Sequence, residues 1–143
     1  MSRWKTIVVG VDGSAGSRKA LTWAAAEAAD HGADLVVVNV WEPTLLPPSG
    51  SGSVSERAQP ESSDDGADDL RQLITEELGA SPPVLVQPKV TRGRPAKVLI
   101  RESAGADLLV VGHRGRGGFK GLVLGSVSQH VAAYAKCPVT VVR

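Results

Sequence analysis

The sequence has few of the residues that mark secreted or membrane-bound proteins. Its one cysteine, Cys137, excludes a disulfide within the chain and indicates a reducing compartment. Cys137 precedes Pro138 at the start of an apolar run, which favours a small core residue over a reactive thiol. No apolar stretch approaches the ~20 residues that a membrane-spanning helix needs. The run over residues 7–11 is too short for a signal peptide and ends at Asp12, so we expect a cytoplasmic protein without membrane partners.

Strong net charge and abundant aromatic residues are also missing. The net charge of +1 gives no reason to expect nucleic acid as a partner. Aromatic residues make up 3% of the chain, and none lies in the basic and aromatic pattern that stacks on single strands. We therefore interpret the three tryptophans as apolar anchors, the last of them a candidate border of the site: Trp4, Trp23 and Trp41.

The three histidines are scattered, so we predict no metal site. His31 lies at an expected helix end, and His113 is a loop residue of the kind that is more often solvated than catalytic. His130 is expected on the semi-buried side of its helix.

The length of the chain is that of one domain with a single core, over residues 1–143. Apolar residues make up 42% and charged residues 22%, as in globular proteins. The segment over about 43–62 is rich in proline, serine and glycine. It predicts a long mobile loop rather than a linker, because neither flank is large enough to stand alone.

Alternating apolar runs and helical patterns predict the order β-α-β-α-β-α-β-α-β. This order implies a parallel sheet with helices on both faces. Gly32 fits the position after the first helix, and Pro88 places its strand at an edge of the sheet. The expected strands are 6–11, 34–41, 84–90, 108–111 and 138–142; the expected helices run from Ser14 to about His31, over 63–78, from Pro95 through Ala104, and from Ser126.

A glycine-rich stretch with basic residues follows the fourth expected strand. Glycines allow backbone N–H groups to approach an anion, and basic side chains compensate its charge, so the stretch suits a phosphate group. A flexible surface loop has the same composition. The stretch is neither a P-loop nor a dinucleotide fingerprint. It contains Gly112, Gly115, Gly117, Gly118 and Gly121, with Arg114, Arg116 and Lys120 between them.

The helix that follows this loop begins at Gly125-Ser126. Ser126 lies three residues before Gln129, the spacing of a capping box, so we expect the Ser126 side chain to cap the helix. The buried stripe is expected to consist of Val127, Val131 and Tyr134.

Two residues separate Gly112 from Gly115, nine separate Gly115 from Gly125, and Ser126 follows. This spacing resembles the Gly-x2-Gly-x9-Gly-Ser nucleotide loop of the universal stress protein family. The resemblance extends to Val8-Gly-Val-Asp-Gly-Ser14 and to Cys137-Pro-Val-Thr-Val-Val-Arg143. It implies a single Rossmann-like α/β domain with strand order 3-2-1-4-5, ATP with Mg²⁺ as ligand, and a homodimer through the last strand.

The resemblance also implies roles for individual residues. Asp12 approaches the base and ribose, although a turn-forming or capping role is the alternative, and Val11 and Val40 wall the adenine slot. The loop glycines, Ser126 and the amides after it hold the phosphates and ribose. Arg114 is a better candidate than Arg116 for clamping phosphate. The candidate binding residues are Gly10, Val11, Asp12, Val40, Gly112, His113, Arg114, Gly115, Gly125, Ser126, Val127 and Ser128.

These observations favour an ATP-binding regulatory module of the stress response with unidentified protein partners. We identify no catalytic residue, because the sequence offers neither a Walker-B-like aspartate nor a convincing base. Two alternatives remain open: an enzyme with at most weak ATP hydrolysis or self-phosphorylation, and an interaction module that does not use nucleotide.

Overall fold

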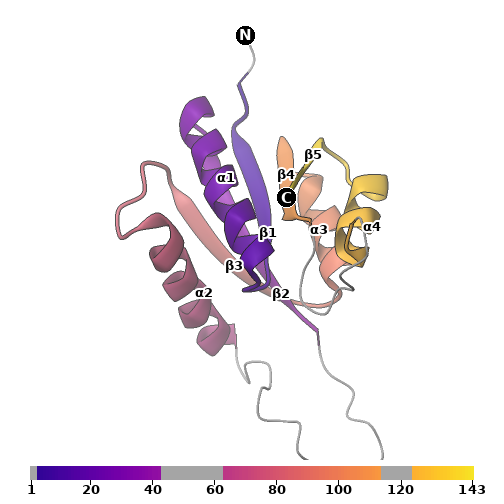
Figure 1. Ribbon diagram of the computed structural model, residues 1–143, viewed down its shortest axis with the longest axis horizontal. Coiled ribbons are helices and arrows are strands. Elements are labelled where there is room, and N and C mark those ends of the chain that lie inside the picture. The colour runs from indigo at the N-terminus through magenta and orange to yellow at the C-terminus, as the bar shows by residue number, and fades with distance from the viewer. Residues whose placement is uncertain (1–2, 43–62, 114–123) are drawn as a thin grey trace, which may run out of the picture.

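The computed structural model describes residues 3–42, 63–113 and 124–143. Five parallel strands form one sheet in the order β3-β2-β1-β4-β5, flanked by helices on both faces (Figure 1), which confirms the predicted fold. The expected loop over 43–62 and residues Arg114, Gly115 and Arg116 lie outside the described residues. The strands are β1 (Thr6–Val11), β2 (Asp34–Trp41), β3 (Val86–Arg92), β4 (Leu108–Gly112) and β5 (Val139–Val142); the helices are α1 (Ala15–His31), α2 (Ser63–Leu78), α3 (Pro95–Ser103) and α4 (Ser126–Tyr134).

Each face of the sheet has its own apolar core, because side chains of a strand alternate between the faces. On one face α1 and α2 pack against the strands, and on the other α3 and α4 do so. Helix α1 lies close to the sheet because its fully buried positions are mostly alanine, as its sequence predicts. The buried residues of α1 include Ala20, Leu21, Ala24 and Ala28.

Helix α1 begins and ends where the sequence places its signals. The hydroxyl of Ser14 accepts a 3.2 Å hydrogen bond from the Ser17 amide, which satisfies a donor of the first turn. Gly32 ends the helix in the left-handed conformation, with φ 66°. Trp4 and Trp23 pack against the core on this face, as expected of anchors.

Strand β3 starts and ends two residues later than predicted. Its register follows β2, from Leu35 opposite Val86 to Trp41 opposite Arg92. The length of its partner therefore sets the bounds of β3, whereas the apolar pattern alone suggested residues 84–90. The edge position predicted from Pro88 is confirmed.

The predicted capping box at α4 is wrong. The capping residue is Gly125, which has no side chain, and Ser126 is already part of the helix. The Gln129 side chain donates to the Leu124 carbonyl at 3.4 Å instead of to a capping serine. The helix begins at Ser126, as predicted, but the residue before it is the cap: the Gly125 amide donates to the His113 carbonyl at 2.8 Å.

The expected buried stripe of α4 also differs from the observed one. Val131 is fully buried and Val127 partly so, but Tyr134 is 62% exposed and His130 is exposed. The two rings contact each other, with centroids 5.2 Å apart. The stripe follows a spacing of four residues, so it continues from Val131 to Ala135 rather than to Tyr134.

Candidate functional site

Strand β1 is the branch point of the sheet. It pairs with β2 on one side, where Val11 lies opposite Asn39, and with β4 on the other, where Val9 lies opposite Val110. Parallel sheets bind ligands outside the carboxyl ends of their strands at the point where the strand order reverses. The loops after β1 and β4 therefore begin side by side, as predicted if these strands are neighbours.

A tight turn follows β1 and fixes Asp12. One carboxylate oxygen of Asp12 accepts hydrogen bonds from the Ser14 amide, at 2.9 Å, and from the Ser14 hydroxyl, at 2.5 Å. The Asp12 amide donates to the Ser17 hydroxyl at 3.2 Å, and Gly13 adopts φ 84°. The turn-forming role considered for Asp12 is thus present. It holds the carboxylate at the end of β1 in a defined orientation.

The side chain of Asn39 adds a contact between β1 and β2 at their last pair of residues, Val11 and Asn39. Its side-chain amide donates to the Val11 carbonyl at 3.0 Å. Sequence reasoning missed this residue, although a polar side chain within an apolar strand was a usable signal. Asn39 also lines a pocket of roughly 150 Å³ between the sheet and α2, with Asp12, Gly13, Gly66, Asp69, Leu70 and Leu73.

The side chains of Val11 and Val40 lie on opposite faces of the sheet. Val11 is buried in the core under α1 and α2, whereas Val40 packs at the edge of the core under α3 and α4. The structure therefore does not bring the two side chains together as walls of one slot. On the face of the sheet where Val40 lies, a ligand could contact the backbone at the end of β1 but not the Val11 side chain.

Two candidate glycines have packing reasons of their own. A Cβ atom on Gly112 would lie 2.9 Å from both the carbonyl carbon and oxygen of Gly16, in the first turn of α1. A Cβ atom on Gly10 would lie 2.8 Å from a methyl of Leu99. Both glycines let a helix approach the strand ends closely.

The described ends of the glycine-rich stretch meet at a hydrogen-bonded stem. The His113 carbonyl accepts from the Gly125 amide at 2.8 Å, and the His113 amide donates to Val142 at 2.7 Å. The buried Ser128 hydroxyl donates to the Gly112 carbonyl at 2.5 Å. This stem fixes the start of α4 beside the end of β4.

The capping residue of α4 is Gly125, which has no side chain to bond the first amides of the helix. The first N–H groups of a helix have no partner within the helix, and the positive end of the dipole lies there. Val127 and Ser128 are among these residues. The arrangement suits an anion bound near the branch point of the sheet.

Among residues 3–42, 63–113 and 124–143, no group of three or more His, Cys, Asp or Glu side chains could hold a metal ion. No helix in the same ranges is long and apolar enough to cross a membrane.

A doubly wound parallel sheet with order 3-2-1-4-5 and glycine-containing turns at its branch point defines an α/β protein of the Rossmann-like class. A model of the universal stress protein family matches residues 3–143, and the chain belongs to that family.

Relatives of known sequence or structure agree with this assignment. A universal stress protein of Mycolicibacterium smegmatis is 40% identical over 142 residues, which cover 96% of this chain and 45% of that protein. The chain thus spans less than half the length of this relative. The universal stress protein UspA from Lactobacillus plantarum superposes with a TM-score of 0.80 at 26% identity, with 100% of both chains covered. A universal stress protein solved in complex with cAMP superposes with a TM-score of 0.71 at 28% identity, covering 99% of this chain and 98% of the other.

Proposed function

We propose that the chain binds ATP with Mg²⁺ at the branch point of its sheet and acts as a cytoplasmic, nucleotide-dependent regulatory module of the stress response. The observation that carries the proposal is the stem at α4, where the bond from Ser128 to Gly112 sets an uncapped helix start beside the Asp12 turn. The cAMP complex of a relative at 28% identity supports an adenine nucleotide as the ligand.

Each part of the nucleotide has a partner of suitable chemistry. The amides of Val127 and Ser128 face the phosphates, and Arg114 and Gly115 belong to the same loop motif. Asp12 accepts from ribose hydroxyls or the base, and Val40 offers apolar contact on the side of the sheet where α4 lies. Mg²⁺ takes oxygen ligands and keeps several waters, so the phosphates would supply ligands and the Asp12 carboxylate is a further candidate.

The test compares Ser126→Glu with Ser126→Gln by calorimetry with ATP and Mg²⁺. Ser126 is exposed in the first turn of α4, where a carboxylate favours the helix but repels phosphate. We expect Ser126→Glu to lower ATP affinity by tenfold or more and to unfold no more easily than the wild type. Ser126→Gln, of the same size, should bind nearly as the wild type does. A wild type that does not bind, or equal affinities of the two variants, contradicts the proposal.

We also propose a homodimer through the open edge of β5. The Val142 carbonyl accepts from His113 and the Pro138 carbonyl accepts from Leu109. The backbone polar groups of even-numbered residues in this strand therefore point toward β4. The N–H of Val141 then faces the open edge, because peptide groups alternate along a strand. Val141→Pro should remove this donor with little effect on the β4 pairing. Light scattering should show dimers for the wild type and monomers for Val141→Pro; monomers for the wild type contradict the interface.

A further inference from the structure

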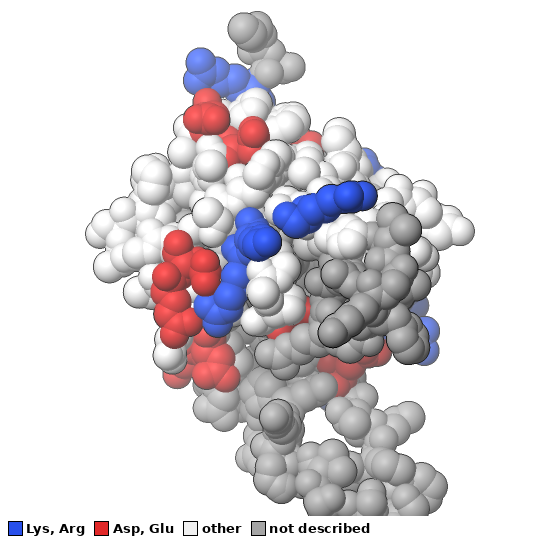
Figure 2. Space-filling model, in the orientation of Figure 1, with Lys and Arg blue, Asp and Glu red and all other residues white. Residues whose placement is uncertain are grey.

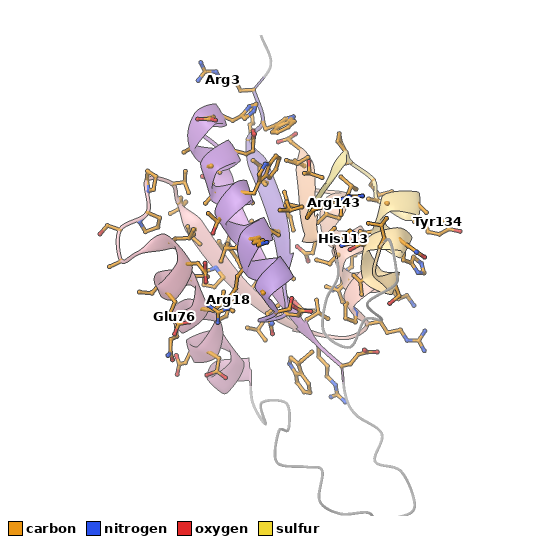
Figure 3. The ribbon with its side chains drawn as sticks, viewed as in Figure 1. Arg3, Arg18, Glu76, His113, Tyr134 and Arg143 are labelled. Carbon is orange, nitrogen blue, oxygen red and sulfur yellow. The ribbon has the colours of Figure 1, made fainter. Side chains whose placement is uncertain are left out.

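Arg18 connects the turn after β1 with helix α2. Its guanidinium donates from Nη1 to Glu77 at 2.9 Å and to Glu76 at 3.2 Å, and from Nε to the Gly13 carbonyl at 3.5 Å. Arg18 lies in the second turn of α1, and both glutamates lie near the end of α2. Figure 3 shows Arg18 and Glu76 extending toward each other between the two helices.

The three contacts have a specific geometry. A guanidinium is a planar fork whose donors can serve several acceptors at once, which a lysine ammonium on a flexible stem does less well. The pKa of Arg18 is raised, first by its hydrogen bond to Glu77 and then by that to Glu76. Gly13 belongs to the same turn that orients Asp12.

Helix α2 lies beside the turn that carries Asp12 and Gly13. Leu70 and Leu73 line the same pocket as Asp12 and Gly13. Figure 2 shows acidic side chains over α2 with basic side chains beside them. Without Arg18, Glu76 and Glu77 would add uncompensated negative charge close to a site that receives an anion.

We propose that Arg18 is a positioning residue that couples nucleotide binding at the Asp12 turn to the ordering of helix α2. This inference rests on the proposed function. A nucleotide that contacts Asp12 restrains the turn, and the Gly13 carbonyl then holds the guanidinium. The guanidinium in turn holds the end of α2. Coupling of this kind is reciprocal, so a better ordered α2 also favours the nucleotide. The acidic face of α2 thereby becomes the surface that reports occupancy.

The experiment measures hydrogen exchange of α2 amides and ATP affinity on the same proteins. The variants are Arg18→Met, which removes the fork, and Arg18→Lys, which keeps only the charge. Lys89→Met is the control: Lys89 pairs with Glu102 at 2.8 Å between β3 and α3, and is comparably exposed. We expect ATP to slow exchange in α2 of the wild type and of Lys89→Met. In Arg18→Met this protection should be lost, and the ATP Kd should rise about fivefold.

A triple variant separates charge from geometry. Arg18→Met with Glu76→Gln and Glu77→Gln removes the uncompensated carboxylates, so it should recover the part of the ATP affinity lost to charge but not the part due to coupling. Protection of α2 should stay absent, because the side chain that bonds to both Gly13 and α2 has been removed. Arg18→Lys should keep more of the ATP affinity of the wild type than of its hydrogen-exchange protection in α2.

The outcomes distinguish the two proposals. Absence of ATP binding by the wild type contradicts the proposed function. ATP binding by the wild type, with α2 protection equal in Arg18→Met and the wild type, overturns the coupling alone. An equal loss of α2 protection in Lys89→Met also overturns the coupling, because removing an unrelated ion pair would then have the same effect.

Discussion

The Ser128 hydroxyl and the Gly112 carbonyl are joined by a 2.5 Å hydrogen bond between the first turn of α4 and the end of β4. Ser128 is buried, so Ser128→Ala would leave this carbonyl without its donor. We expect the variant to lose about 1 kcal/mol of unfolding free energy and to bind ATP more weakly. Denaturant unfolding and calorimetry measure the two effects.

Ser126→Ala is the matched control. The Ser126 side chain is exposed and makes no cap bond, so its unfolding free energy should change by no more than about 0.5 kcal/mol. A loss of ~1 kcal/mol or more, as expected for removing a helix cap, would contradict the observed start of α4.

Gly112→Ala should destabilise the fold through crowding. Its Cβ atom would lie 2.9 Å from backbone atoms of Gly16 and 3.2 Å from the Ser17 amide, and backbone cannot rotate away as a side chain can. We expect a loss of ~1–3 kcal/mol in thermal or denaturant unfolding. Gly105→Ala is the control, because nothing lies within 4 Å of the Cβ position there. Equal stability of the two variants would show that the approach of α1 to β4 is less close than described.

Ser103→Ala should also be costly, although it lies far from the candidate site. Ser103 is fully buried; its hydroxyl donates to Ile100 at 2.6 Å and accepts from the Lys136 amide at 2.8 Å. Removing it leaves a donor without a partner, at a cost of ~1–3 kcal/mol in unfolding free energy. Lys136→Ala keeps that amide and removes only an exposed side chain, so the variant should unfold nearly as the wild type does.

Asp107 should make stability depend on pH. Its carboxylate accepts from the Lys5 and Thr6 amides at 2.7 and 3.0 Å, and these bonds, that of Lys5 first, lower the pKa of Asp107 in the folded protein. The stabilisation is complete above the ordinary carboxyl pKa and is lost as the pH falls through the lowered value.

Asp107→Asn should therefore be less stable than the wild type at neutral pH, and the difference should disappear in strong acid. Thermal unfolding from neutral pH to about pH 2 measures this. Asp34→Asn, which changes an exposed side chain at the start of β2, serves as the control. A difference that grows on acidification would exclude the assigned contact.

The sequence predicted the elements whose signals are local. Apolar runs placed β1, β2 and β4, and Ser14 and Gly32 marked the ends of α1, because caps and turns depend on a few adjacent residues. Features set by distant partners were not predictable in this way. Strand β3 takes its bounds from β2, and α4 is capped by Gly125, whose amide bonds to the distant His113 carbonyl, rather than by Ser126.

The candidate site follows the same division. The expected strand order predicted that the two glycine-containing loops lie side by side, and the pairing of β1 with β4 confirms this. It did not reveal the contact of Asn39 with Val11, or the packing that restricts Gly10 and Gly112. Those contacts depend on side chains from other elements. The binding roles of the individual residues remain predictions that the Ser126 variants address.

Pro88 makes the two edges of the sheet unequal. The Leu85 carbonyl accepts from Leu35, and the Gly93 amide donates to Trp41, so the N–H and C=O groups of odd-numbered residues of β3 point toward β2. The backbone nitrogen of Pro88, which carries no hydrogen, therefore points to the open edge. The β3 edge thus already has the feature that Val141→Pro would introduce at β5. In the homodimer proposed above, both copies would therefore expose only their proline-bearing β3 edges. The same residue that marks an edge strand in the sequence thus disfavours the addition of another strand at the β3 edge.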